Sequence, residues 1–265
     1  MSKRVTAKDK TGKEWWIVTP NVGVYSFATN PNKVTFLEIF YFFAQHLIKI
    51  PKKLKAEDEK RIRESRLRIL LELDNRVQQL LFFANESRKQ GTKILQTKPR
   101  RKICSYKPYQ IFLSHLTAYL NALHSLRDEV LAIDNLMGKN YSEKIWQKDW
   151  FKIDVDIRTL LHHIESPMFT TEGQQFRFRF ERLDLMDKKK AKFLTDPEQT
   201  SAELLLDPKD ISKDAMDDLN IWAKKYLNLL DKTATMEAVT GYQKDGRTKT
   251  KKVTLGALMK VAHIT

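Results

Sequence analysis

Cysteine is almost absent from this chain, since Cys104 is the only one among 265 residues. One cysteine cannot form an intramolecular disulfide bond, which excludes a disulfide-stapled secreted scaffold and a Cys-x-x-Cys redox motif. The first residues, Met1 to Arg4, lead into polar sequence and not into the apolar core of a signal peptide. We therefore expect a cytoplasmic protein.

Long hydrophobic runs are also scarce. The most apolar segment, residues 34–50, is interrupted by Glu38, Gln45 and His46, whereas a membrane-spanning helix needs about 20 consecutive apolar residues. We expect this segment to be a buried helix and expect no membrane partner. The sequence has no glycine-rich phosphate loop and no Ser-His-Asp order with supporting motifs. Nucleotide hydrolysis is therefore not indicated, and no cofactor is expected.

Negative charge is in the minority. The chain has 48 Lys and Arg against 33 Asp and Glu, a formal net charge of +15, and such a charge attracts polyanions. We expect RNA or another nucleic acid as a partner. The predicted contacts are two basic clusters without acidic residues and the arginines of one strand-like segment: Lys98, Arg100, Arg101, Lys102, Arg177, Arg179, Arg247, Lys249, Lys251 and Lys252. For the two clusters, simple solubility is an equal alternative.

Apolar residues recur at spacings of three and four in four long segments, which predicts amphipathic helices. These segments are residues 57–88, 112–133, 146–164 and 212–229. The loop around Gly138 is short, so the second and third helices should form an antiparallel hairpin. Pro167 cannot continue a helix and should end the third one shortly before it.

Shorter segments have the character of strands. Phenylalanine alternates with charged residues over 176–180, which is typical of a strand with one apolar and one mainly basic face. Residues 14–27 and the tail around Asp245-Gly246 are typical of β-hairpins. Ser212 and Thr254 are expected to cap the helices that follow them. The predicted fold is mainly α, a helical bundle with a helical N-terminal region and small β-hairpin elements.

The segment from 91 to 108 has no apolar period and is rich in lysine and arginine, which favours a linker. We therefore expect a basic linker at 99–108. It would separate an N-terminal region, 1–98, from a helical domain at 109–235. The remaining residues, 236–265, would form a basic C-terminal hairpin and short helix.

Chemically capable side chains converge in one place, the last turns of the predicted helix at 146–164. Arg158 and His162 are four residues apart and share one flank of that helix, whereas His163 lies on the other flank. A histidine near neutral pH can accept or donate a proton, and a guanidinium can bind two phosphate oxygens at once. Both histidines lie at the edge of the packed face of the helix, which suits a site at a helix–helix or dimer groove.

Arg158 and His163, with four residues between them, resemble the motif of HEPN domains, an all-helical family with many metal-independent endoribonucleases and RNA-binding toxins. The segment 109–231 is similar to the family's helical layout. The resemblance implies an RNA-targeting toxin or defence effector in which Arg158 contacts phosphate, His163 is the general acid and base, and His162 is an accessory neighbour. It also implies a homodimer and an antitoxin or defence-complex partner. Thr159 stands where family members commonly have asparagine, aspartate or histidine.

Other interpretations of the same residues stay open at this point. The histidines can instead bind the last carbonyls of their helix and interact with its dipole. A metal site formed by His162, His163 and Glu165 is disfavoured, because adjacent histidines on a helix diverge, and we expect no metal. The alternative function is a non-catalytic nucleic-acid-binding or scaffold protein whose helical hairpin is a dimer interface.

Overall fold

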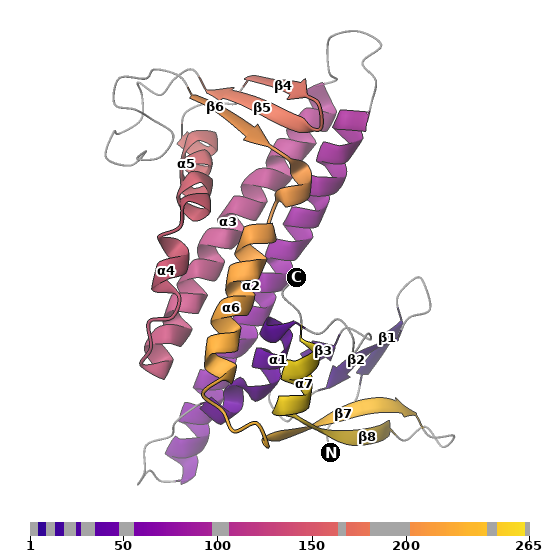
Figure 1. The fold of residues 1–265 in the computed structure, drawn as a ribbon, viewed down its shortest axis with the longest axis vertical. Coiled ribbons are helices and arrows are strands. Elements are labelled where there is room, and N and C mark those ends of the chain that lie inside the picture. Colours follow the sequence, from indigo (N-terminus) through magenta and orange to yellow (C-terminus); the bar gives the residue numbers. More distant parts are fainter. Residues whose placement is uncertain are drawn as a thin grey trace. The chain divides into compact units, whose positions relative to one another are not determined.

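The computed structural model describes residues 5–8, 14–18, 25–27, 35–47, 56–96, 106–163, 168–180, 202–242 and 248–262. Some side chains within these ranges are not described, those of His162 and His163 among them. The described chain is mostly helical with small antiparallel sheets (Figure 1), which confirms the predicted mainly-α class.

The helices follow the predicted order. They are α1 (Phe36–Phe43), α2 (Ala56–Gln96), α3 (Tyr106–Met137), α4 (Glu143–Trp146), α5 (Asp149–His163), α6 (Lys213–Leu227) and α7 (Leu255–Val261), with short 3-10 helices η2 (Ala44–Leu47) and η4 (Pro208–Asp210). The strands are β1 (Val5–Lys8), β2 (Glu14–Val18), β3 (Tyr25–Phe27), β4 (Met168–Glu172), β5 (Gln175–Phe180), β6 (Ala202–Leu206), β7 (Thr235–Tyr242) and β8 (Thr248–Thr254). They pair antiparallel as β1-β2-β3, β4-β5-β6 and β7-β8.

The contacts divide the chain into two compact units. Unit 1 contains Met1–Asp74, Ala132–Tyr141 and Met216–Thr265, and unit 2 contains Asn75–Leu131 and Ser142–Ala215. The helices α2, α3 and α6 each contribute to both units. The boundaries between the units therefore fall inside helices and differ from the consecutive segments expected from composition. Part of the expected linker, residues 99–105, lies outside the described residues.

In unit 1, the apolar segment near residue 40 is a buried helix, as predicted. Thr35 and Glu38 form a capping box at its start: the Glu38 amide donates to Thr35 Oγ1 at 3.2 Å, and the Thr35 amide donates to Glu38 Oε2 at 2.7 Å. Ile39, Phe40 and Phe43 have no exposed surface. No helix in the described part of the chain has the length and apolar character needed to cross a membrane.

The core of unit 1 also contains a satisfied polar network. The buried carboxylate of Asp134 accepts hydrogen bonds from Trp222 Nε1 at 2.9 Å and from the Tyr226 hydroxyl at 2.6 Å. Asn220 Oδ1 accepts a hydrogen bond from the Leu37 amide at 3.0 Å and links α6 to α1. Buried polar groups need such partners, so these bonds specify how α1, α3 and α6 meet in this unit.

In unit 2, α3 and α5 run antiparallel, as predicted for the hairpin. Asn121 contacts Arg158, whereas His124, one turn later on α3, contacts Phe151, which lies two turns earlier on α5. The strand β5 alternates as expected: Phe176 and Phe178 are buried, and Phe176 contacts Phe112 of α3 with ring centroids 4.8 Å apart. The β4-β5-β6 sheet thus covers the beginning of α3 (Figure 1).

The helix predicted at 146–164 is two helices, because the chain breaks between Trp146 and Asp149. The break changes the phase of the second helix, and Phe151, Asp156 and Ile157 become its buried residues while Trp150 is only half-buried. The predicted single stripe through Trp146 and Trp150 is therefore wrong for the first half of the segment. Ile157 faces the interior as predicted.

The two predicted helix caps have different outcomes. Thr254 caps α7, since its Oγ1 accepts a hydrogen bond from the Ala257 amide at 3.2 Å. Ser212 directly precedes α6, but its φ of 71° lies in the left-handed region and not in the extended region typical of an N-cap. Its hydroxyl instead accepts a hydrogen bond from Arg88 at 2.7 Å. A tertiary contact thus replaces the expected local one.

Candidate functional site

Arg158, the arginine of the predicted motif, lies on α5 and is held by α3. Its Nε donates a hydrogen bond to Asn121 Oδ1 at 2.7 Å, and the side chain is half-buried. Within the described residues, its two terminal nitrogens have no hydrogen-bond partner. The adjacent Thr159 hydroxyl donates to the Val155 carbonyl at 2.9 Å, a bond inside the helix. The guanidinium is therefore oriented by one nitrogen, and its remaining donors can bind an anion.

Two further basic residues of α3, His124 and Arg127, lie against Phe151 of α5. The rings of His124 and Phe151 have centroids 6.3 Å apart, and the Arg127 guanidinium carbon lies 6.0 Å from the Phe151 centroid. Burial lowers the pKa of His124, and the positive charges of Arg158 and Arg127 lower it further against the opposing effect of Asp128. His124 is therefore a neutral imidazole at neutral pH, under the electrostatic influence of both guanidinium groups. We call Asn121, His124, Arg127, Phe151 and Arg158 the α3–α5 seam.

The structure brings Arg158 near His124, a histidine that was not among the predicted site residues. The backbones of His162 and His163 form the last two residues of α5, as predicted, but their side chains are not described. His124 was missed because it lies 34 residues before Arg158 in the chain. The only signal was the predicted antiparallel hairpin, in which a residue of α3 near 124 must lie opposite a residue of α5 near 155.

The predicted nucleic-acid contacts are only partly described. Arg177 is half-buried and Arg179 exposed on β5 in unit 2, and Lys252 is exposed on β8 in unit 1. Lys249 and Lys251 belong to β8, but their side chains are not described. The remaining predicted contacts, Lys98, Arg100, Arg101, Lys102 and Arg247, lie outside the described residues.

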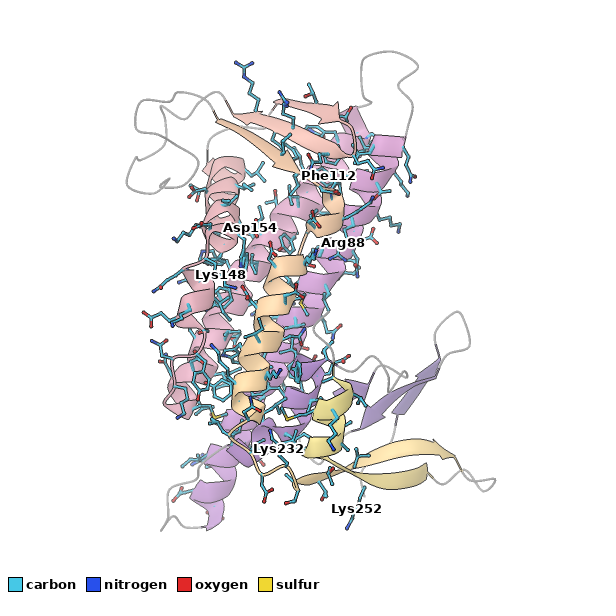
Figure 2. All side chains as sticks on the ribbon, in the orientation of Figure 1. Arg88, Phe112, Lys148, Asp154, Lys232 and Lys252 are labelled. Carbon is cyan, nitrogen blue, oxygen red and sulfur yellow. The ribbon has the colours of Figure 1, made fainter. Side chains whose placement is uncertain are left out.

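A second feature of unit 2 is a cavity of about 280 Å³. Its walls come from α3, α5, β5, β6 and the start of α6, and most of them are apolar. Four carboxylates line it, those of Asp154, Asp207, Asp210 and Asp214. We call it the Asp154 cavity. Figure 2 shows Asp154 on α5 and Arg88 on α2, both within unit 2.

The carboxyl group of Asp154 is chemically unusual. Burial, and then the nearby charge of Asp214, raise its pKa to about 7. Burial also raises the pKa of the neighbouring Tyr119 phenol well above its usual range, and the charge of Asp154 adds to this effect. The Arg88 guanidinium makes its hydrogen bonds elsewhere, to the Ile211 carbonyl, to Ser212 Oγ and to Asn85 Oδ1, and its charge partly offsets the rise in the Tyr119 pKa.

Asp154 was not among the predicted site residues, although the sequence contains a signal for it. Trp150, Ile153, Ile157 and Leu161 form a helical stripe, and Asp154 lies in the middle of it. A carboxylate at an apolar position of a stripe is costly unless it has a partner or a proton. Such a position therefore indicates either a titrating group or a ligand contact.

In the described ranges, no group of three or more His, Cys, Asp or Glu side chains is arranged to hold a metal ion. Comparison of the chain with known protein families, with curated proteins and with solved structures found no match.

Proposed function

We propose that this protein is a metal-independent endoribonuclease, an RNA-targeting toxin or defence effector that acts in the cytoplasm as a homodimer. The observation that carries the proposal is the α3–α5 seam, where Arg158 is oriented by Asn121 and the charges of Arg158 and Arg127 both act on His124. The net charge of +15 would attract RNA to the protein. The resemblance of Arg158 and His163 to the HEPN motif supports the same chemistry.

The residues of the seam fit the cleavage of RNA by its own 2′-hydroxyl. A neutral imidazole accepts the proton of the 2′-hydroxyl as its oxygen forms a bond to phosphorus. Arg158 and Arg127 stabilise the negative charge that develops on the phosphate oxygens. A protonated histidine then donates a proton to the leaving 5′-oxygen, and the products are a 2′,3′-cyclic phosphate and a 5′-hydroxyl. We assign the base to His124 and the acid to His163, the motif histidine.

The test is cleavage of labelled RNA in the presence of a chelator. Arg158→Ala, His163→Ala and His124→Ala should each lower the rate about 10²–10⁴-fold, because each removes a proton-transfer or charge-stabilising group. His162→Ala is the matched control and should retain most activity. Arg158→Lys, which keeps the charge but not the planar fork, should stay well below the wild type.

The outcomes separate the two functions considered for this chain. If both His163→Ala and His124→Ala cleave RNA at the wild-type rate, the catalytic assignment is overturned. RNA binding without cleavage in every sample, the wild type included, supports instead the non-catalytic nucleic-acid-binding protein with the helical hairpin as a dimer interface. Circular dichroism of each variant shows that a lost rate is not lost folding, and sedimentation of the same samples tests the homodimer.

A further inference from the structure

We propose that the Asp154 cavity binds a small amphipathic amine, with the ammonium group beside the Asp154 carboxylate and the apolar body against the surrounding side chains. This site is separate from the proposed cleavage of RNA and does not depend on it. Its ligand has the opposite charge to RNA. The proposal stands on the shape and lining of the cavity and on the missing counter-charge inside it.

The walls of the cavity suit an apolar ligand body. Leu113, Leu116, Leu120, Ile153, Ile157 and Phe178 contribute to the lining. Ligand sites in proteins are mainly apolar, with a few polar groups that fix the orientation of the ligand. The volume of about 280 Å³ lies just below the range for such sites, about 300–1,000 Å³. The ligand is therefore a small molecule and not a polymer.

Among the described residues, no lysine or arginine lines the cavity. Within the described residues, no hydrogen bond or ion pair reaches the carboxylate of Asp154. The groups that face it from other elements are Asp214 of α6, which adds negative charge, and Tyr119 of α3, which is neutral. Asp207 and Asp210 line the same cavity and add to the negative potential.

The nearby guanidinium groups are used elsewhere. Arg88 donates its hydrogen bonds to Ile211, Ser212 and Asn85. On α5 itself, Arg158 lies one turn after Asp154 and binds Asn121. An unpaired carboxylate in apolar surroundings is unfavourable until a proton or a cation neutralises it. A bound ammonium group supplies both the charge and three hydrogen-bond donors.

The lining also distinguishes an amine from other ligands. Phosphates and carboxylates are repelled by four aspartates. A metal ion needs several close ligands, and no such group of side chains exists in the part of the chain that the structure describes. A single carboxylate is enough to bind an ammonium group, and Asp154 provides one in this cavity.

The experiment compares three probes of equal length on the full chain by calorimetry at about pH 8: hexylammonium, hexanol and hexanoate. Hexylammonium should bind about tenfold or more tightly than hexanol, and hexanoate should bind weakest. Lowering the pH from about 8 to about 6 should weaken the binding of hexylammonium, because Asp154, with a pKa of about 7, becomes protonated while the amine keeps its charge. The binding of hexanol should change little.

Variants test the assignment to Asp154. Asp154→Asn should abolish the preference for the amine and retain the binding of hexanol, which also shows that the variant is folded. Asp149→Asn, an exposed carboxylate of the same helix outside the cavity lining, is the matched control and should behave as the wild type. The proposal is overturned if hexanol and hexylammonium bind equally, if Asp154→Asn leaves the preference intact, or if none of the probes binds. None of these results bears on the proposed cleavage of RNA, which is tested by a separate assay.

Discussion

Two charged residues one helical turn apart on α5 have opposite environments. Arg158 is held by Asn121 and lies near His124, whereas Asp154 lines a cavity together with Asp214. Each side chain gains its chemical character from residues of another element. The structure thus places a basic site and an acidic site on one short helix.

At Gly91 of α2, the neighbouring residues leave no space for a side chain. A Cβ atom at this position would lie 2.8 Å from Pro208 Cγ and 3.1 Å from a ring carbon of Phe176. In an open helix, alanine would stabilise by up to about 1 kcal/mol relative to glycine. Here the steric overlap should reverse the sign, and Gly91→Ala should lower the free energy of unfolding by about 1–3 kcal/mol in denaturant titrations.

The control for this prediction is the same change in a Pro208→Gly background. Glycine removes both Cγ and Cβ of residue 208, which would lie 2.8 Å and 2.9 Å from the added methyl group, so this methyl group should then cost much less than in the wild type. An equal loss of stability in both backgrounds would show that Pro208 is not the cause.

At the scale of the element, α5 shows why a stripe of apolar residues is an incomplete description of a helix. Trp150, Ile153, Ile157 and Leu161 line the cavity together with Asp154. The break after α4 sets the phase in which these side chains are presented. A carboxyl group at a lining position makes the stability of this helix dependent on pH.

We predict that Asp154 makes unit 2 less stable as the pH rises. Its pKa is raised to about 7 in the folded chain, above about 3.9 in an unfolded chain. The folded state therefore binds the proton more tightly, and this stabilisation is complete below about pH 4 and lost as the pH rises to about 7. Asp154→Asn should be more stable than the wild type at about pH 8, by about 2–4 kcal/mol, and nearly equal to it at about pH 4.

Thermal or denaturant unfolding of both proteins across this pH range is the measurement. Asp210→Asn, which removes an exposed carboxylate at the same cavity, is the matched control and should change the stability by no more than about 0.5 kcal/mol. If Asp154→Asn destabilises the protein more at about pH 8 than at about pH 4, the carboxylate has a partner that stabilises its charged form, and an equal effect at both pH values would show that its pKa is not raised.

At the scale of the whole molecule, the excess of positive charge is the property most relevant to a partner. The chain carries a net charge of +15, while the described cavity is lined by aspartates. The protein thus combines a field that attracts polyanions with a local site that repels them. Binding of RNA and binding of a small amine should therefore respond differently to salt and to substitutions.

The affinity for single-stranded RNA should fall steeply with salt, because each phosphate contact releases a counterion. The triple variant Lys249→Ala, Lys251→Ala and Lys252→Ala should reduce the slope of log affinity against log salt by about 2 if all three lysines of β8 contact phosphates. A control variant replaces three exposed lysines of other elements, Lys144, Lys213 and Lys260. Equal slopes for both variants would show that β8 has no special role in binding.

Much of the fold was predictable because its signals are local. The alternation of Phe176 and Phe178 with arginines predicts β5, and the hydroxyl of Thr254 caps α7 within one turn. Ser212 was assigned wrongly as a cap because Arg88, 124 residues away, binds its hydroxyl. Of the candidate site, Arg158 and its place on a helical hairpin were predicted, while His124 was not.

The sequence alone therefore determined the helices, the strands, the antiparallel hairpin and the charge, since apolar periodicity and net charge depend only on the order and kind of residues. Only the tertiary structure decided which charged groups meet. The lowered pKa of His124 depends on its burial and on the charges of Arg158 and Arg127, and the raised pKa of Asp154 depends on burial and on Asp214. Burial and electrostatic interaction act through space, and the distances that control them arise only when the helices pack.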